Sequence, residues 1–96
     1  MVVIWSNGAK VELKKAFEYI SLDSSQNAKM VIATLIDLTL ALGNHPEKHP
    51  LDKFKKENDG SFRAFEKYSY RISYRLMADQ IRVVRFRHTS KSPLTY

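Results

Sequence analysis

The first half of the chain begins with a short apolar run, and two segments with helical spacing of apolar residues follow it. Residues 2–5 (VVIW) are uniformly apolar, a pattern typical of a strand buried on both faces. In residues 9–20, apolar side chains recur at helical spacing and lysines take the opposite side, which predicts an amphipathic helix. Apolar residues again share one face from Ala28 to Leu42, which predicts a second helix stopped by Gly43. A short serine-rich turn joins the two into a helical hairpin.

The last third of the chain changes to a period of two. Residues 62–68, 70–77 and 81–88 each indicate a strand, and a short polar turn joins the last two. In the middle segment, tyrosine, isoleucine and leucine take one face while Arg71 and Arg75 take the other. The loop before these strands, residues 43–61, contains prolines and an Asn-Asp-Gly cluster, with a possible helical turn around residues 53–57.

This order predicts an α+β fold over residues 1–96 as a single domain. The elements run β-α-α-β-β-β, and the economical arrangement packs the helical hairpin on one face of a small, mostly antiparallel sheet. The apolar first strand is expected in the sheet interior, beside a late strand. Arg71 and Arg75 are then left on the uncovered face or its rim.

Charge is distributed very unevenly over this fold. The formal net charge is +6. Residues 1–42 and 43–61 each hold four lysines and four acids, for a net charge of zero. Residues 62–96 hold eight Lys and Arg against two acids, and every arginine of the protein is among them. The excess charge therefore belongs to the strands, which favours a polyanionic partner.

Composition excludes several classes of protein. There is no cysteine, which removes disulfides and a thiolate nucleophile from consideration. No apolar run reaches the roughly 18 residues that a membrane helix needs, and no signal-peptide pattern is present at the N-terminus. We therefore expect a cytoplasmic protein without a membrane partner.

One histidine-rich stretch, residues 45–52 (HPEKHPLD), invites interpretation as a metal site. Its two prolines prevent a regular helix that would align the histidines, and no further ligand pair appears. We therefore expect neither a metal nor another cofactor. The lysines that follow, Lys53, Lys55 and Lys56, either form a basic loop that contacts phosphates or balance the acids of a solvated loop.

The arginines of the predicted strands allow two interpretations. A guanidinium group offers a planar set of donors that fits phosphate oxygens, so Arg71 and Arg75 can bind a nucleic-acid backbone. Tyr68, Tyr70 and Phe65, if exposed, could stack on bases of a single strand. Alternatively, the charged positions are the solvated face of an ordinary strand.

His88 ends the last predicted strand and can transfer a proton near neutral pH. Cleavage of RNA needs an acid, a base and cations that stabilise the phosphorane charge, and His88 beside Arg85 and Arg87 would suit such a site. A lone histidine is more often structural, however. Strict alternation also places His88 on the face of Val84 and Phe86, with Val83 on the face of the arginines.

Three stretches together resemble the RelE/ParE superfamily of bacterial type II toxins: residues 3–21 (VIWSNGAKVELKKAFEYIS), 62–76 (FRAFEKYSYRISYRL) and 81–96 (IRVVRFRHTSKSPLTY). The resemblance implies a helical hairpin on a mainly antiparallel sheet. It also implies a toxin neutralised by a small cognate antitoxin that wraps its active surface. RelE-like members cleave mRNA on the ribosome without a metal, whereas ParE-like members poison DNA gyrase.

The resemblance also suggests roles for individual residues. Arg71 matches an arginine that stabilises the scissile phosphate in RelE-like nucleases, and His88 matches a general acid near the C-terminus of YoeB-like members. Arg87 would stabilise charge beside His88. Tyr96 lies near the position of a catalytic tyrosine of RelE-like members. The general-base glutamate of YoeB-like members has no clear counterpart in this chain, and His49 falls closest to its position. The expected phosphate contacts are Lys53, Lys55, Lys56, Arg75 and Arg85.

Three hypotheses about function follow. The favoured one is a ribosome-dependent mRNA endonuclease, with the ribosome and mRNA as partners. The alternative is a gyrase inhibitor that acts by protein–protein binding without catalysis. A third is a degenerate member that retains only antitoxin binding.

Overall fold

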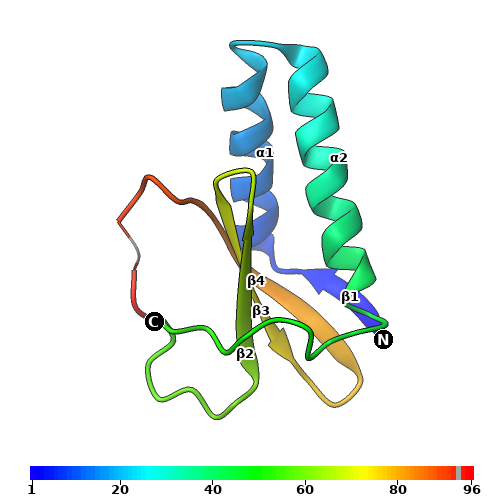
Figure 1. The fold of residues 1–96 in the computed structure, drawn as a ribbon, viewed down its shortest axis with the longest axis vertical. Helices are drawn as coiled ribbons and strands as arrows, with labels where there is room; N and C mark the ends of the chain where they lie inside the picture. Colours follow the sequence, from blue (N-terminus) through cyan, green and yellow to red (C-terminus); the bar gives the residue numbers. More distant parts are fainter. Residues whose placement is uncertain (93) are drawn as a thin grey trace.

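Two helices and four strands follow one another in the predicted order (Figure 1). The computed structural model describes residues 1–92 and 94–96. Within this part of the chain, no helix is both long enough and apolar enough to cross a membrane. The elements are β1 (Val2–Trp5), α1 (Asn7–Ser21), α2 (Ser25–Ala41), β2 (Phe62–Lys67), β3 (Tyr70–Leu76) and β4 (Gln80–His88).

Both helices begin at a serine cap. The Ser6 hydroxyl accepts a hydrogen bond from the Ala9 backbone N–H at 3.1 Å, and Ser24 does the same for Asn27 at 3.0 Å. These contacts satisfy N–H groups that have no partner within the first helical turn. Helix α2 therefore starts at Ser25, a polar turn earlier than its apolar face indicates.

The sheet has the strand order β1-β4-β3-β2. Strand β1 runs parallel to β4, and the other two pairs are antiparallel, as expected for a mostly antiparallel sheet. The prediction that β1 lies beside a late strand is confirmed, but its placement in the sheet interior is wrong. Val2 and Ile4 are 63% and 40% exposed, because β1 forms an edge and the helices cover only its other face.

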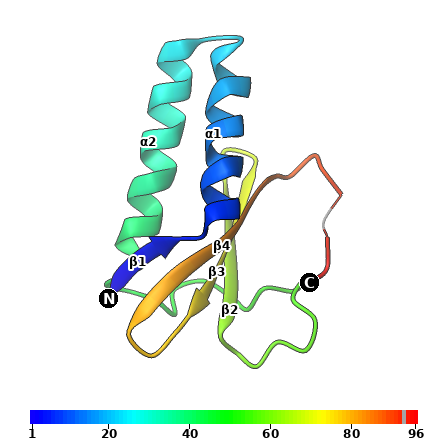
Figure 2. The same ribbon diagram turned by 180° about the vertical axis from the view of Figure 1, so that it is seen from behind.

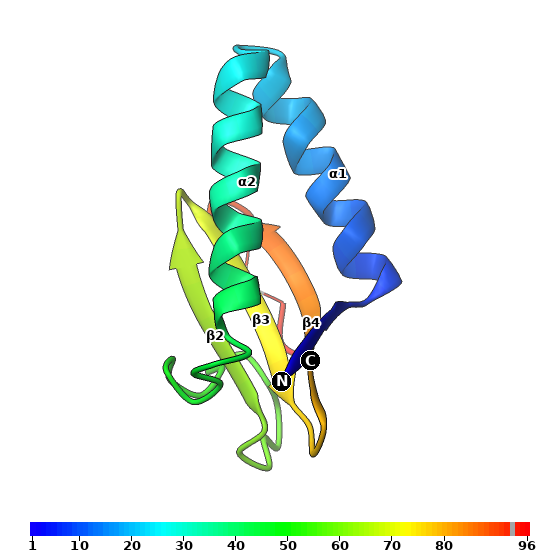
Figure 3. The same cartoon turned by 90° about the vertical axis from the view of Figure 1, so that its right-hand side faces the viewer.

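The helical hairpin packs on one face of the sheet and extends beyond its end (Figures 1 and 3). Leu35 of α2 and Ile72, Ile81 and Phe86 of the central strands are almost fully buried in this layer. The opposite face of the sheet, called the open face below, carries the alternate positions. Arg71 and Arg75 lie there, as the alternation of β3 predicts.

A β-bulge changes the alternation of β4. Ser73 pairs with Arg85 but Tyr74 pairs with Val83, so Val84 is an extra residue in β4. Val83 and Phe86 are consequently both buried against the helices, at 0% and 1% exposure. The prediction that Val83 shares a face with Arg85 and Arg87 is therefore wrong.

The segment between α2 and β2 crosses the edge of the sheet onto the open face. Leu51 forms an antiparallel bridge with Arg63, and the Asp52 N–H donates to Phe62 O at 2.9 Å. Residues 53–57 form turns and bends, not the helical turn suggested by the sequence. The C-terminal segment returns to meet this loop, as Figure 2 shows from behind, and the Tyr96 N–H donates to Phe54 O at 3.0 Å.

Candidate functional site

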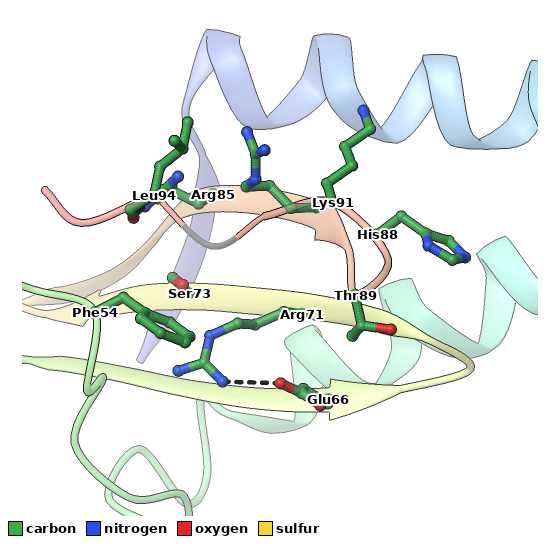
Figure 4. Close-up of a pocket in the computed structure, with 10 residues that line it drawn as sticks. Phe54, Glu66, Arg71, Ser73, Arg85, His88, Thr89, Lys91 and Leu94 are labelled. Atoms are coloured by element: carbon green, nitrogen blue, oxygen red, sulfur yellow. Dashed lines mark hydrogen bonds and ion pairs between the residues drawn. The ribbon is translucent and has the colours of Figure 1, made fainter.

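The open face around Arg71 brings together strands, loop and C-terminal segment. Its floor consists of β2, β3 and β4, and the loop after Asp52 and the segment ending at Tyr96 lie over it (Figure 4). A cavity of about 80 Å³ opens here, far smaller than the roughly 300 Å³ at which small-molecule pockets begin. The residues around it are Phe54, Glu66, Arg71, Ser73, Arg85, Arg87, His88, Thr89, Lys91 and Leu94.

Arg71 is bound by two carboxylates. Its Nη2 donates to Asp52 Oδ1 at 2.8 Å, and its Nη1 donates to Glu66 Oε2 at 3.0 Å. The guanidinium carbon lies 4.7 Å from the centroid of the Phe54 ring. Two negative charges in contact with one cation leave it little electrostatic attraction for a phosphate.

Asp52 is the buried centre of this network. Its side chain is fully buried and accepts hydrogen bonds from Arg71, from the Phe54 N–H at 3.1 Å and from the Tyr96 hydroxyl at 2.6 Å. Burial raises the pKa of the carboxyl, but the hydrogen bonds from Tyr96 and Arg71 outweigh burial and bring it below its ordinary value. Asp52 therefore remains an anion at neutral pH.

Tyr96 closes the network from the C-terminal segment. Lys56 N–H and Lys55 Nζ donate to its main-chain oxygen at 2.6 and 3.2 Å. Its ring meets Phe62 edge to face at 5.9 Å. Burial, followed by the hydrogen bond to Asp52, raises the pKa of the Tyr96 hydroxyl. A hydroxyl that donates to a buried carboxylate is held in its protonated form and is poorly suited to serve as a base.

Arg85 and Arg87 hold the C-terminal segment by its backbone. Arg85 Nη1 donates to Leu94 O, and the guanidinium lies 4.5 Å from the centroid of the Tyr96 ring. Arg87 Nη2 donates to Ser92 O at 3.3 Å. Carbonyl oxygens satisfy these donors without neutralising them, so both arginines keep their charge.

His88 does not face Arg71. In Figure 4 its ring points away from the guanidinium, and it meets the Tyr70 ring of the helix-covered face edge to face at 5.0 Å. The Ser90 N–H donates to His88 Nδ1 at 3.1 Å, so the neutral ring carries its proton on Nε2. The structure thus brings Arg71, Arg87 and Tyr96 to one face and turns the His88 ring to the other.

His49 packs against the helix-covered face of the sheet, with its ring beside Phe65 and Tyr74. Its ring stacks on Phe65 at 4.5 Å, on the side where β2 meets the helices. Its backbone oxygen accepts a hydrogen bond from Arg63 Nη1 at 2.7 Å. Burial, and then the neighbouring Lys48, lower the pKa of His49. His49 is therefore placed to support the loop rather than to accept a proton beside Arg71.

The remaining expected phosphate contacts lie on the open face or its loop. Arg75 Nε donates to Ser61 Oγ at 3.2 Å, and Arg75 Nη2 lies 3.7 Å from Asp59. Lys53 and Lys56 are exposed. Lys55 Nζ lies 4.9 Å from the centroid of the Phe62 ring.

Three residues of the site carried no usable signal in the sequence. The sequence indicates Asp52 only as part of the possible metal stretch, and it gives no indication of a role for Glu66 or Phe54. Among the described residues, no group of three His, Asp or Glu side chains is placed to hold a metal ion. The contacts of Asp52 join segments 19 and 44 residues away, a relation that spacing within one element does not reveal.

The contacts of these side chains suit a structural role better than acid–base catalysis. Acid–base cleavage requires a proton donor and a proton acceptor within hydrogen-bond reach of one reacting group. Here Arg71 is neutralised, the Tyr96 hydroxyl is engaged, and His88 points elsewhere. The network ties the loop and the C-terminal segment to the sheet.

Comparison with known proteins identifies relatives of this fold. The family described as "ParE toxin of type II toxin-antitoxin system, parDE" matches residues 3–93. No curated protein sequence matches the chain. A solved structure described as "Chromosomal ParDE TA system from P. aeruginosa" contains a chain similar to this one, with a TM-score of 0.73 and 15% identity. The alignment covers 92% of this chain and 95% of that chain, which establishes a shared fold.

Proposed function

Because the chain belongs to the ParE toxin family of type II toxin–antitoxin systems, we propose that it acts as a non-catalytic poison of DNA gyrase. Its action then depends on protein–protein binding in the cytoplasm, and a cognate antitoxin neutralises it. The arginine-rich strands, considered alone, favour mRNA cleavage, and gyrase inhibition takes its place as the proposed function.

The observation that carries this proposal is the state of Arg71. Its guanidinium contacts both Asp52 and Glu66, whereas a nuclease needs that cation available for the scissile phosphate. The second required group is also misplaced, because His88 packs against Tyr70 and is bound by Ser90. Neither His49 nor Tyr96 supplies a base near Arg71.

The contacts of Arg71 and His88 also determine which substitution can distinguish mRNA cleavage from gyrase inhibition. Arg71→Ala is a poor choice, because it leaves the buried Asp52 carboxylate unpaired and impairs folding under either hypothesis. His88→Ala is better, because the contacts of His88 with Ser90 lie in the exposed part of the chain. We expect His88→Ala to remain as toxic as the wild type in induced cells.

The decisive experiment pairs a gyrase supercoiling assay with mapping of mRNA ends in cells that express the toxin. We expect loss of supercoiling without new mRNA ends. Cleaved mRNA ends with unchanged supercoiling, abolished by His88→Ala, would establish the endonuclease instead. If the wild-type toxin neither inhibits supercoiling nor cleaves mRNA but still binds the antitoxin, it is a degenerate toxin.

A further inference from the structure

Two pairs of arginines lie directly opposite each other on the open face. Arg71 pairs with Arg87, and Arg75 pairs with Arg82, across the antiparallel strands β3 and β4. Like charges at directly opposed positions destabilise a sheet. Stability alone therefore does not account for this arrangement.

Compensation reaches only one member of each pair. Arg71 contacts Asp52 and Glu66, and Arg75 lies 3.7 Å from Asp59. Among the described residues, the salt bridges include no carboxylate partner for Arg82 or Arg87. The same holds for the other cations of this side, so the basic face is defined as Arg82, Arg85, Arg87, Lys53, Lys55 and Lys56.

Several cations of the open face are held in place by aromatic rings. Arg85 lies over the Tyr96 ring at 4.5 Å and Arg75 over Phe62 at 4.9 Å. Lys55 contacts both rings, at 4.9 Å for Phe62 and 5.4 Å for Tyr96. A cation placed before binding loses less conformational entropy when it meets an anion.

The same cation–ring contacts indicate whether this face suits the bases or the phosphates of a nucleic acid. The faces of Phe62 and Tyr96 are occupied by cations, and Phe65 and Tyr70 are buried. Tyr68 is 44% exposed, but it lies in the turn between β2 and β3, and Lys67 Nζ lies 4.9 Å from its ring centroid. Bases of a single strand need exposed aromatic platforms. The open face instead presents guanidinium and ammonium donors, which suit phosphate oxygens irrespective of sequence.

We propose that the basic face binds the phosphate backbone of the duplex DNA held by gyrase, so that the toxin contacts both the enzyme and its bound DNA. The inference rests on the proposed gyrase target for its setting. The charge of the face supplies the complementarity, and the competing occupant is an acidic surface of a protein.

The first test measures binding of the purified full chain to a fluorescent blunt DNA duplex of arbitrary sequence, over a range of salt concentrations. Arg82 and Lys53 suit substitution because both are exposed and Arg82 lies outside the network around Tyr96. We expect Arg82→Gln and Lys53→Gln each to lower the slope of log K against log salt by about 0.9, one phosphate contact each.

Matched controls remove one charge elsewhere. Lys10→Gln and Lys29→Gln change exposed residues of α1 and α2, and we expect the wild-type slope for both. Equal weakening by all four substitutions would show that only net charge matters, and would overturn the assignment of the face. Absence of salt-dependent binding by the wild type would overturn it as well.

The second test compares wild type and the Arg82→Gln/Lys53→Gln double variant against gyrase. We expect the double variant to lose inhibition of supercoiling but to capture DNA-free gyrase as well as the wild type does. Weaker capture of DNA-free gyrase would assign the face to protein binding and overturn the inference, as would undiminished inhibition. If the wild type binds duplex DNA through this face but leaves gyrase active, the proposed target is wrong and the DNA-binding surface stands.

Discussion

At the scale of single residues, Asp52 and Arg71 depend on each other. Removing one partner of a buried ion pair leaves an uncompensated charge, which costs about 3–5 kcal/mol. We expect Arg71→Ala to lower the free energy of unfolding by about this amount in urea titrations. Adding Asp52→Asn should recover part of the loss, because it removes the unpaired charge.

Arg75→Ala is the matched control for Arg71→Ala. Its partner Asp59 is 62% exposed and 3.7 Å away, and such surface pairs contribute at most about 1 kcal/mol. If Arg75→Ala destabilises the protein as much as Arg71→Ala does, the special role of the buried pair is refuted.

The Tyr96 hydroxyl gives a second residue-scale prediction. Tyr96→Phe keeps the ring between Phe62 and Arg85 but removes a donor to a buried carboxylate, which should cost about 1–3 kcal/mol. Tyr19→Phe is the control, because Tyr19 is 68% exposed. Thermal unfolding of the two variants measures the difference, and equal melting temperatures would contradict the assigned role of the hydroxyl.

At the residue scale, the sequence predicts the face on which a side chain lies but not the partners that it contacts. Alternation along β3 correctly predicts that Arg71 lies on the open face. It cannot predict that Asp52 neutralises Arg71, because that contact depends on the path of an irregular loop. The resemblance to nuclease arginines therefore suggested a free cation where the structure has a bound one.

At the scale of elements, the junction between α2 and β1 tolerates no side chain at Gly43. A Cβ placed there would clash with the carbonyl oxygen of Met1, the residue that immediately precedes the edge strand β1. The Met1 amino group also donates to Gly43 O at 2.9 Å. We expect Gly43→Ala to displace the start of β1 and cost about 1–3 kcal/mol, as overpacking does elsewhere.

Gly8→Ala provides the opposite expectation at the start of α1. A Cβ at Gly8 has no neighbour within 4 Å, and alanine is favoured over glycine in helices by up to about 1 kcal/mol. Chemical denaturation should therefore show a loss for Gly43→Ala and no loss for Gly8→Ala. A neutral Gly43→Ala would mean that β1 adjusts without cost.

Strand β4 shows why the sequence predicts which elements are present and in what order, but not which face each residue takes. Its apolar residues correctly indicate a strand, but the bulge at Val84 shifts the alternation by one position. Nothing in the residue types of β4 distinguishes Val84 from its neighbours. The faces of Val83 and Arg85 were therefore assignable only from the register with β3.

At the scale of the whole molecule, the loop and the C-terminal segment complete a sheet that the helices cover on one face only. The sequence predicts the hairpin, the strands and the concentration of charge, because each is set by local periodicity or composition. Mutual docking of residues 52–56 and 94–96 depends on contacts between distant segments. Such contacts are the part of the fold that the sequence pattern does not contain.

The stability of the whole molecule should fall toward alkaline pH. The folded state raises the pKa of Tyr96 above the ordinary value of 10.0, and burial also raises the pKa of Tyr70 and of Tyr74. The folded state therefore keeps protons that the unfolded chain releases, so this stabilisation is complete below pH 10 and is lost above it. Tyr96→Phe should reduce the alkaline loss without abolishing it.

Toward acid, two groups should act in succession. Burial and then Lys48 lower the pKa of His49 below 6.5, and the pKa of Asp52 lies below 3.8. Each group binds protons more readily in the unfolded chain, so stability is lost as the pH falls through each folded-state pKa, first for His49 and then for Asp52. Urea titrations from pH 8 to about pH 3 measure both steps. His49→Phe should remove the first and Asp52→Asn the second, and an unchanged pH profile in either variant would assign that step to another group.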